Sequence, residues 1–193
     1  RWRVADKEEA DAAAATRFAG RANLRSFRDG HPCWRKITDP LVFSKDADEA
    51  VILDPDLYFP NRFAFEPAPD SGILLMRQGP NCLYPPEAVQ RAFAAPVRLA
   101  NHVDIGVAQV RAGAIDLDWL DWFVGAIGAR DFDTFMHIEA IVWSALAMKM
   151  GGGYLDPGAW RCWQRGHVKR VLLALGAKGD QMLNATKERK ERV

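Results

Sequence analysis

Residues 51–60 constrain the fold of this chain more than any other stretch. A short apolar run, Val51-Ile52-Leu53, is followed at once by Asp54-Pro55-Asp56, an aromatic pair and a second proline. A run this short, rich in β-branched residues and closed by an acidic proline turn, predicts a buried strand rather than a helix. In an open α/β sheet, ligands bind just beyond the carboxyl ends of the strands. The pattern therefore places Asp54 and Asp56 where a binding site is expected.

Asp54 and Asp56 have the chemistry of a metal site. Carboxylate oxygens are ligands that Mg²⁺ and Mn²⁺ prefer, and a bound metal can in turn hold a diphosphate. The alternative is structural, because Asp and Pro both favour turns, and the tripeptide could be only a polar exit from the strand. The tripeptide alone leaves both readings open, and the residues around it favour the metal site.

Length and charge limit the class of protein that can carry such a site. The chain has 193 residues, enough for one domain with a substantial core. Its net charge of +1 gives no reason to expect nucleic acid or acidic lipid as a partner. The longest strongly apolar stretch, near residues 140–148, is far too short for a membrane span, and no signal peptide pattern is present.

The three cysteines indicate the compartment. Cys33, Cys82 and Cys162 are widely spaced, odd in number and form no Cys-x-x-Cys pair. This spacing favours neither a zinc site nor a disulfide framework. It is typical of a reducing compartment, so we expect a cytoplasmic protein.

Helix and strand patterns alternate along the chain, which predicts one α/β domain over residues 1–193. We expect three layers, with a mixed or mostly parallel central sheet flanked by helices. Residues 1–30 form a helical N-terminal segment and residues 186–193 a charged tail. The expected strands are 51–53, 73–76 and 101–110, and the expected helices are 5–19, 87–93, 116–127, 136–150 and 167–175.

Residues 31–40 combine basic and aromatic side chains after a Gly-His-Pro turn. Arg35 and Lys36 could contact phosphate, and Trp34 could stack on a ring of a bound cofactor. The alternative is a surface loop with Trp34 tucked into the core. The sequence alone does not separate these two readings.

The order of these features resembles the nucleotide-sugar glycosyltransferases of the GT-A type. Those enzymes have an Asp-x-Asp at the end of an apolar strand, here Asp54-Pro55-Asp56, and later a strand that the segment Asn101-His102-Val103-Asp104-Ile105-Gly106-Val107 loosely matches. A helix opening with an acidic residue follows, here His137-Ile138-Glu139-Ala140, and several members use a late histidine, here His167, as a further metal ligand. The resemblance covers about residues 31–170.

The resemblance implies a GT-A-like fold and metal-assisted transfer of a sugar from a nucleotide-diphosphate sugar to an unknown acceptor. Mn²⁺ or Mg²⁺ would be held by Asp54, Asp56 and His167. Arg35, Lys36 and Trp34 would bind the donor. The chain departs from the family in one respect: only 53 residues precede Asp54 and they are helical first, where the family begins with a nucleotide-binding strand. This predicts a chain shortened at its N-terminal end.

An inverting enzyme of this type needs a carboxylate facing the acceptor hydroxyl, and Glu139 and Asp104 are the candidates. Each has a structural alternative, a first-turn carboxylate offsetting the helix dipole for Glu139 and a hydrogen-bond partner at a strand end for Asp104. In a strand, His102 and Asp104 point to one face. At a helix start, His137 and Glu139 diverge by about 200°. We expect Glu139 to face the cleft, with Asp104 across from it.

Two other functions compete. The strand and Asp54-Pro55-Asp56 also resemble the first motif of haloacid dehalogenase-like phosphatases, which would make Asp54 the nucleophile and Asp56 the acid/base. Lys169 and Asp180 supply the remaining residues of that family poorly. The third function is a non-catalytic sugar- or nucleotide-binding module, in which tryptophans such as Trp160 and Trp163 would stack on sugars.

Overall fold

The computed structural model describes residues 4–55, 57, 59, 62, 64–79 and 81–160, and of Asp104 and Ile105 only the backbone. All of these residues belong to one unit of the chain, residues 1–160. The prediction of a single domain over residues 1–193 is therefore not tested beyond residue 160. None of the described helices is long and apolar enough to cross a membrane.

A four-stranded mixed sheet forms one layer of this unit. Its strands are β1 (Glu49–Leu53), β2 (Ile73–Arg77), β3 (Val103–Arg111) and β4 (Gly152–Tyr154), in the spatial order β1-β3-β2-β4. β3 runs antiparallel to both β1 and β2, whereas β4 runs parallel to β2. The predicted strands are confirmed. Of the two sheet types expected, the mixed sheet is right and the mostly parallel sheet is wrong for the described residues.

The sheet packs one face against the helices. In β1 every second residue is buried, as expected for a strand that is half exposed. The paired positions on the buried face come from three strands in register, namely Ala50 and Ile52, Ile73 and Leu75, and Ala108 and Val110.

Six α-helices lie in the described part of the chain. They are α1 (Lys7–Arg17), α2 (Ala22–Arg28), α3 (Arg35–Phe43), α4 (Pro86–Ala94), α5 (Leu117–Ala126) and α6 (Ile138–Met150). Short 3₁₀ turns occur at η1 (Pro32–Trp34), η2 (Ala112–Ala114) and η3 (Ala129–Phe132). The predicted helices within the described residues are confirmed, and α2 lies inside the predicted helical N-terminal segment, but α3 stands where no helix was expected. The missed helix α3 matters for function because it carries Lys36.

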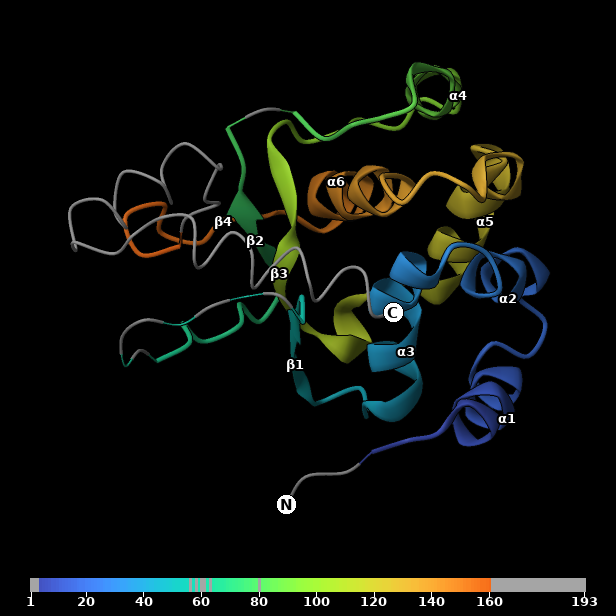
Figure 1. The fold of residues 1–193 in the computed structure, drawn as a ribbon, viewed down its shortest axis with the longest axis horizontal. Coiled ribbons are helices and arrows are strands. Elements are labelled where there is room, and N and C mark those ends of the chain that lie inside the picture. The colour runs from blue at the N-terminus through green and yellow to red at the C-terminus, as the bar shows by residue number, and fades with distance from the viewer. Residues whose placement is uncertain are drawn as a thin grey trace, which may run out of the picture. The chain divides into compact units, whose positions relative to one another are not determined.

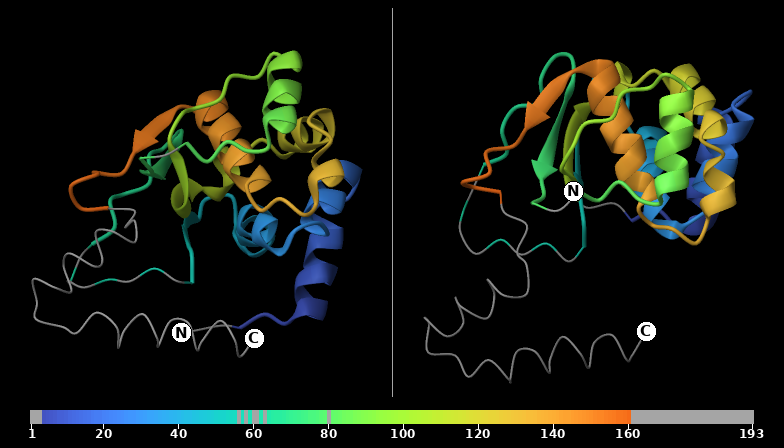
Figure 2. Two further views of the ribbon diagram at one scale, coloured as in Figure 1. Left: turned by 45° about the horizontal axis from the view of Figure 1, so that its top comes forward. Right: turned by 90° about the horizontal axis from the view of Figure 1, so that it is seen from above.

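The helices gather on one side of the sheet, as Figures 1 and 2 show. α6 contacts β3 and β2, and α3 contacts β1. Every residue of α6 from Ile138 to Leu146 is buried, so this helix is apolar on nearly all sides except at Glu139 and Ser144. The described residues thus form two layers, and the third layer that we expected is not seen among them.

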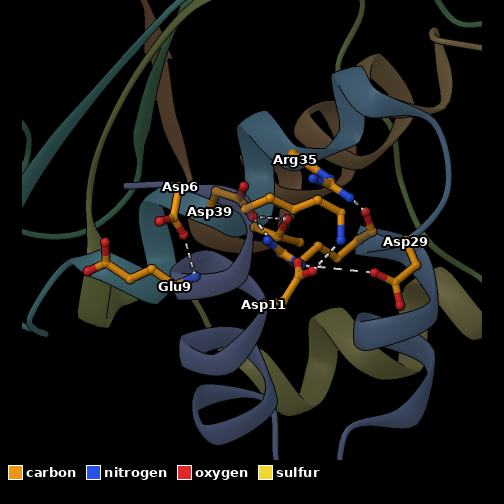
Figure 3. Close-up of polar contacts among 9 residues, drawn as sticks. Asp6, Glu9, Asp11, Asp29, Arg35 and Asp39 are labelled. Atoms are coloured by element: carbon orange, nitrogen blue, oxygen red, sulfur yellow. Dashed lines mark hydrogen bonds and ion pairs between the residues drawn. The ribbon is translucent and has the colours of Figure 1, made fainter. Parts of the chain in front are cut away.

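Arg28 connects the three N-terminal helices, and Figure 3 shows two of its partners, Asp11 of α1 and Asp39 of α3. Its almost fully buried guanidinium donates from Nη1 to Asp11 on α1 and from Nε to Asp39 on α3, both at 2.6 Å. Lys7 and Arg28 together lower the pKa of Asp11 to about 2, so this carboxylate stays charged. The ion pairs hold α3 against α1 and α2, and they fix the helix on which the site depends.

Candidate functional site

Three charged side chains meet at the carboxyl end of β1. Lys36 Nζ lies 2.6 Å from Asp54 Oδ1 and 3.0 Å from Glu139 Oε2. They come from α3, from the residue after β1 and from the first turn of α6. We call Lys36, Asp54 and Glu139 the charged cluster.

The backbone holds Asp54 in place. The strand ends at Leu53, yet the Asp54 N–H still donates to the Gly106 carbonyl at 2.8 Å, which extends the β1/β3 pairing by one residue. The carboxylate therefore projects from a fixed edge of the sheet. This is the position that the sequence predicts for Asp54.

Glu139 is the buried member of the cluster, with no exposed surface. Its Oε1 accepts a hydrogen bond from Trp143 Nε1 at 3.2 Å, one helical turn along α6. Among the described residues Oε2 accepts no hydrogen bond, and the Lys36 ion pair is its compensation. Burial raises the pKa of Glu139 to about 7, although Lys36 and Trp143 oppose the shift.

The same buried, negatively charged surroundings also shift the pKa values of the Lys36 ammonium and the Cys33 thiol. Burial alone would lower the pKa of Lys36, but Glu139 and Asp54 outweigh it, so the pKa is raised and the ammonium stays protonated. Cys33, a free cysteine one turn before Lys36, has its pKa raised by burial and by both carboxylates. The thiol is therefore protonated at neutral pH.

A ligand would meet only part of the cluster. The side chains of Asp54 and Lys36 keep 23% and 18% of their surface, whereas that of Glu139 keeps none. The expectation that Glu139 faces a cleft is therefore wrong for the described residues, because Lys36 and Trp143 cover its oxygens. With Glu139 ionised, one ammonium and two carboxylates leave the cluster with one negative charge.

Trp34 and Arg35, expected to bind the donor with Lys36, lie elsewhere. Trp34 is fully buried, stacks on Phe27 with ring centroids 4.8 Å apart, and donates to the Phe135 carbonyl. It therefore has no face on which a ligand could stack. Arg35 Nε donates to the Arg28 carbonyl at 3.4 Å, and Figure 3 shows Arg35 beside Asp29 and Asp39. Lys36 alone of the three reaches Asp54.

The remaining predicted residues are only partly placed. Asp104 lies in β3, but its side chain is outside what the structure describes. His102 precedes β3 and has a φ of 59°, so it is not part of the strand, and the expectation that it shares a strand face with Asp104 is wrong. Asp56 and His167 lie outside the described residues, as do the alternative candidates Lys169, Asp180 and Trp163.

The described residues do not form a site for a divalent metal. They contain no group of three His, Cys, Asp or Glu side chains that could hold an ion. The ammonium of Lys36 also lies against Asp54 Oδ1, where a metal bound to that oxygen would be. No step of a reaction through a metal follows from this geometry.

Two other features lie outside the cluster. An open hollow of about 570 Å³ is lined by residues of α1, α2 and η3, including Arg28, whose charge Asp11 and Asp39 already balance. Trp160 packs on Phe65 and Phe59, at centroid distances of 5.7 and 6.2 Å. Neither contains a residue of the charged cluster.

The sequence analysis missed the contact between Lys36 and Glu139 and the nearby thiol of Cys33. No local pattern predicts the contact with Glu139, but a signal for α3 was present, because Trp34, Ile37, Thr38 and Leu41 follow the i, i+3, i+4, i+7 spacing of a helix. That pattern places Cys33 and Lys36 one turn apart.

Comparison of the chain with protein-family models, with curated proteins and with solved structures finds no match in any of the three.

Proposed function

We propose that this chain transfers a sugar from a nucleotide-diphosphate sugar to an acceptor, at the carboxyl end of β1. One observation supports the proposal above the others. Sequence patterns in three distant segments predict separate parts in this reaction for Lys36, Asp54 and Glu139. In the structure Lys36 contacts both carboxylates at the expected edge of the sheet. A site at the end of a strand is also where α/β proteins bind ligands.

Each residue of the charged cluster has a separate part in this proposal. Lys36 is the cation nearest the exposed side, and it would stabilise negative charge as the nucleoside diphosphate leaves. Asp54 would orient the ligand beside it. Glu139 has a pKa of about 7, which suits a general base, but it is sealed from the acceptor. We therefore assign Glu139 the part of a positioning residue that holds Lys36, and Asp104 stays the candidate base.

Mn²⁺ or Mg²⁺ belongs to the proposal as a predicted cofactor. The predicted ligands are Asp54 together with Asp56 and His167. Because the Lys36 ammonium lies 2.6 Å from Asp54 Oδ1, the metal would come to this site together with the diphosphate of the nucleotide. The chemistry that the metal would supply is charge neutralisation on the diphosphate.

The phosphatase is the second candidate, and the contact of Lys36 with Asp54 favours it. An ammonium 2.6 Å from a carboxylate nucleophile would reduce its repulsion from a phosphate. Against it, Lys169 and Asp180 supply the remaining residues of that family poorly, and both lie outside the described residues. The two functions differ in what they release, so one set of assays separates them.

Calorimetric titration with UDP and with GDP, each with and without Mn²⁺, tests the proposal. We expect one nucleotide to bind, and Asp54→Asn to weaken its binding at least about tenfold, or 1.4 kcal/mol. Asp133→Asn is the matched control, because Asp133 pairs only weakly with Arg130 at 4.0 Å and lies outside the cluster. Release of phosphate from an aryl phosphate, with no binding of either nucleotide, would support the phosphatase instead. Binding of free sugar without metal would support the binding module.

A further inference from the structure

We propose that Lys36 is the resident cation of Asp54 and keeps divalent metal ions off this carboxylate in the free protein. The inference starts from the disagreement between the metal site that the sequence predicts and the charged cluster that the described residues form. It concerns the choice of cation at Asp54 and does not require that the chain transfer sugars.

The first argument is the geometry at Asp54. Lys36 Nζ lies 2.6 Å from Oδ1. Mg²⁺ and Mn²⁺ bind carboxylate oxygens at about 2.0–2.2 Å, so a metal on the lone pair that the ammonium uses would occupy the same space as the ammonium. A metal on the other oxygen of Asp54 would lie a few ångströms from a positive charge and be repelled by it.

The second argument is that moving Lys36 away from Asp54 would also take its charge away from the buried carboxylate of Glu139. Glu139 is fully buried, and Lys36 is the cation 3.0 Å from its Oε2. If the ammonium swings away, Oε2 keeps no hydrogen bond from any described residue, and a buried carboxylate is left uncompensated. Glu139 thus holds Lys36 on its buried side. A metal ion that binds Asp54 would have to displace the ammonium from the partly exposed side.

The third argument is the placement of the anchor residues. Lys36 stands in the first turn of α3, which the Arg28 ion pairs hold in place, and Glu139 stands in the fully packed helix α6. Both ends of the ion pair are therefore fixed by helices rather than by loops. The ammonium is pre-positioned before any ligand arrives.

Mn²⁺ binding, measured by calorimetry and by the EPR signal of free Mn²⁺ with no nucleotide present, tests this inference. The variant is the pair Lys36→Met and Glu139→Gln, which removes the ammonium and the buried carboxylate together so that no buried charge is left alone. We expect this pair to bind Mn²⁺ at least about tenfold more tightly than the unmodified protein. With Glu139 ionised, the cluster carries a net charge of −1 in both proteins, so a change in net charge would not explain the gain.

Two controls identify the cause of such a gain. Lys36→Arg keeps a cation at Asp54 and should bind Mn²⁺ no more tightly than the unmodified protein. Adding Asp54→Asn to the paired variant should abolish the gain, which separates Asp54 from ligands such as Asp56 and His167. Equal Mn²⁺ affinity in the unmodified protein and the paired variant would overturn the inference, as would a gain that survives Asp54→Asn. Thermal unfolding of each variant confirms that folded protein is compared. Because no nucleotide or sugar is present, a negative result in this experiment does not contradict the proposed glycosyl transfer. A chain that transfers no sugar would likewise leave the inference about Lys36 unaffected.

Discussion

The carboxylate of Glu139 has no exposed surface, and its ionisation is therefore tied to folding. Burial disfavours the charged form more than Lys36 and Trp143 favour it, so its pKa rises from 4.5 to about 7. A carboxyl with a raised pKa binds its proton more tightly in the folded chain than in the unfolded chain. Its contribution to stability is complete below about pH 4.5 and is lost as the pH rises toward 7.

We expect Glu139→Gln to remove this pH dependence. Between pH 5 and pH 8 the unmodified protein should lose about 2–3 kcal/mol more unfolding free energy than the variant, because about two pH units of the interval from 4.5 to about 7 fall in this range, at about 1.4 kcal/mol per unit. Denaturant unfolding of both proteins across this range measures the difference, because all other titrating groups are shared. Parallel pH profiles would contradict the burial-driven shift.

For single residues, the sequence predicted which side chains belong to the site better than it predicted whether those side chains are exposed. It picked Lys36, Asp54 and Glu139 because charged groups at strand ends and helix starts follow local rules. It did not decide between a stacking and a buried Trp34, and it wrongly expected Glu139 at a cleft. Exposure depends on what packs above a side chain, and here the packing comes from α3, which Pro40 and the missing side-chain N-cap concealed.

At the scale of elements, the pairing of β2 with β4 depends on glycine. Gly152 has a φ of 120°, and a Cβ there would collide with the backbone of Ile73. The pairing continues through Ile73 N–H to the Gly151 carbonyl and Leu155 N–H to the Leu75 carbonyl, both at 3.0 Å. Gly152 is the glycine that this close approach of two backbones requires.

Gly152→Ala should therefore destabilise the protein by more than about 1 kcal/mol, through both the backbone strain and the collision. Gly153→Ala is the matched control, since a Cβ on Gly153 meets nothing within 4 Å. We expect the control to lie within about 0.5 kcal/mol of the unmodified protein. Thermal or denaturant unfolding measures both, and equal effects of the two substitutions would show that close approach does not govern this pairing.

The direction in which the strands pair was the part of the fold that local sequence patterns did not predict. The apolar runs at residues 51–53, 73–76 and 101–110 predict strands, and the structure confirms them. Alternating helices and strands suggested a mostly parallel sheet, but β3 lies antiparallel between β1 and β2. Direction is decided by how the connecting segments cross the sheet, which residue periodicity does not record. β4 was missed in part because Gly-Gly-Tyr has little strand propensity.

At the scale of the whole molecule, the charged cluster is a product of tertiary structure. Residues 36, 54 and 139 are brought together by a sheet edge and by two helices that pack on the same side of it (Figure 1). Local patterns predict a separate part for each residue in one reaction, but they do not predict that Lys36 contacts both carboxylates. This convergence, in a chain with a net charge of only +1, is the basis of the proposed glycosyl transfer.

The measurement that tests this account most directly is release of nucleoside diphosphate from a panel of UDP- and GDP-sugars, followed by mass spectrometry with Mn²⁺ present and with water as the acceptor. The account predicts release from at least one donor, its loss in Asp54→Asn, and its retention in Asp133→Asn. No release from any donor, together with no binding of UDP or GDP, would contradict glycosyl transfer at the end of β1.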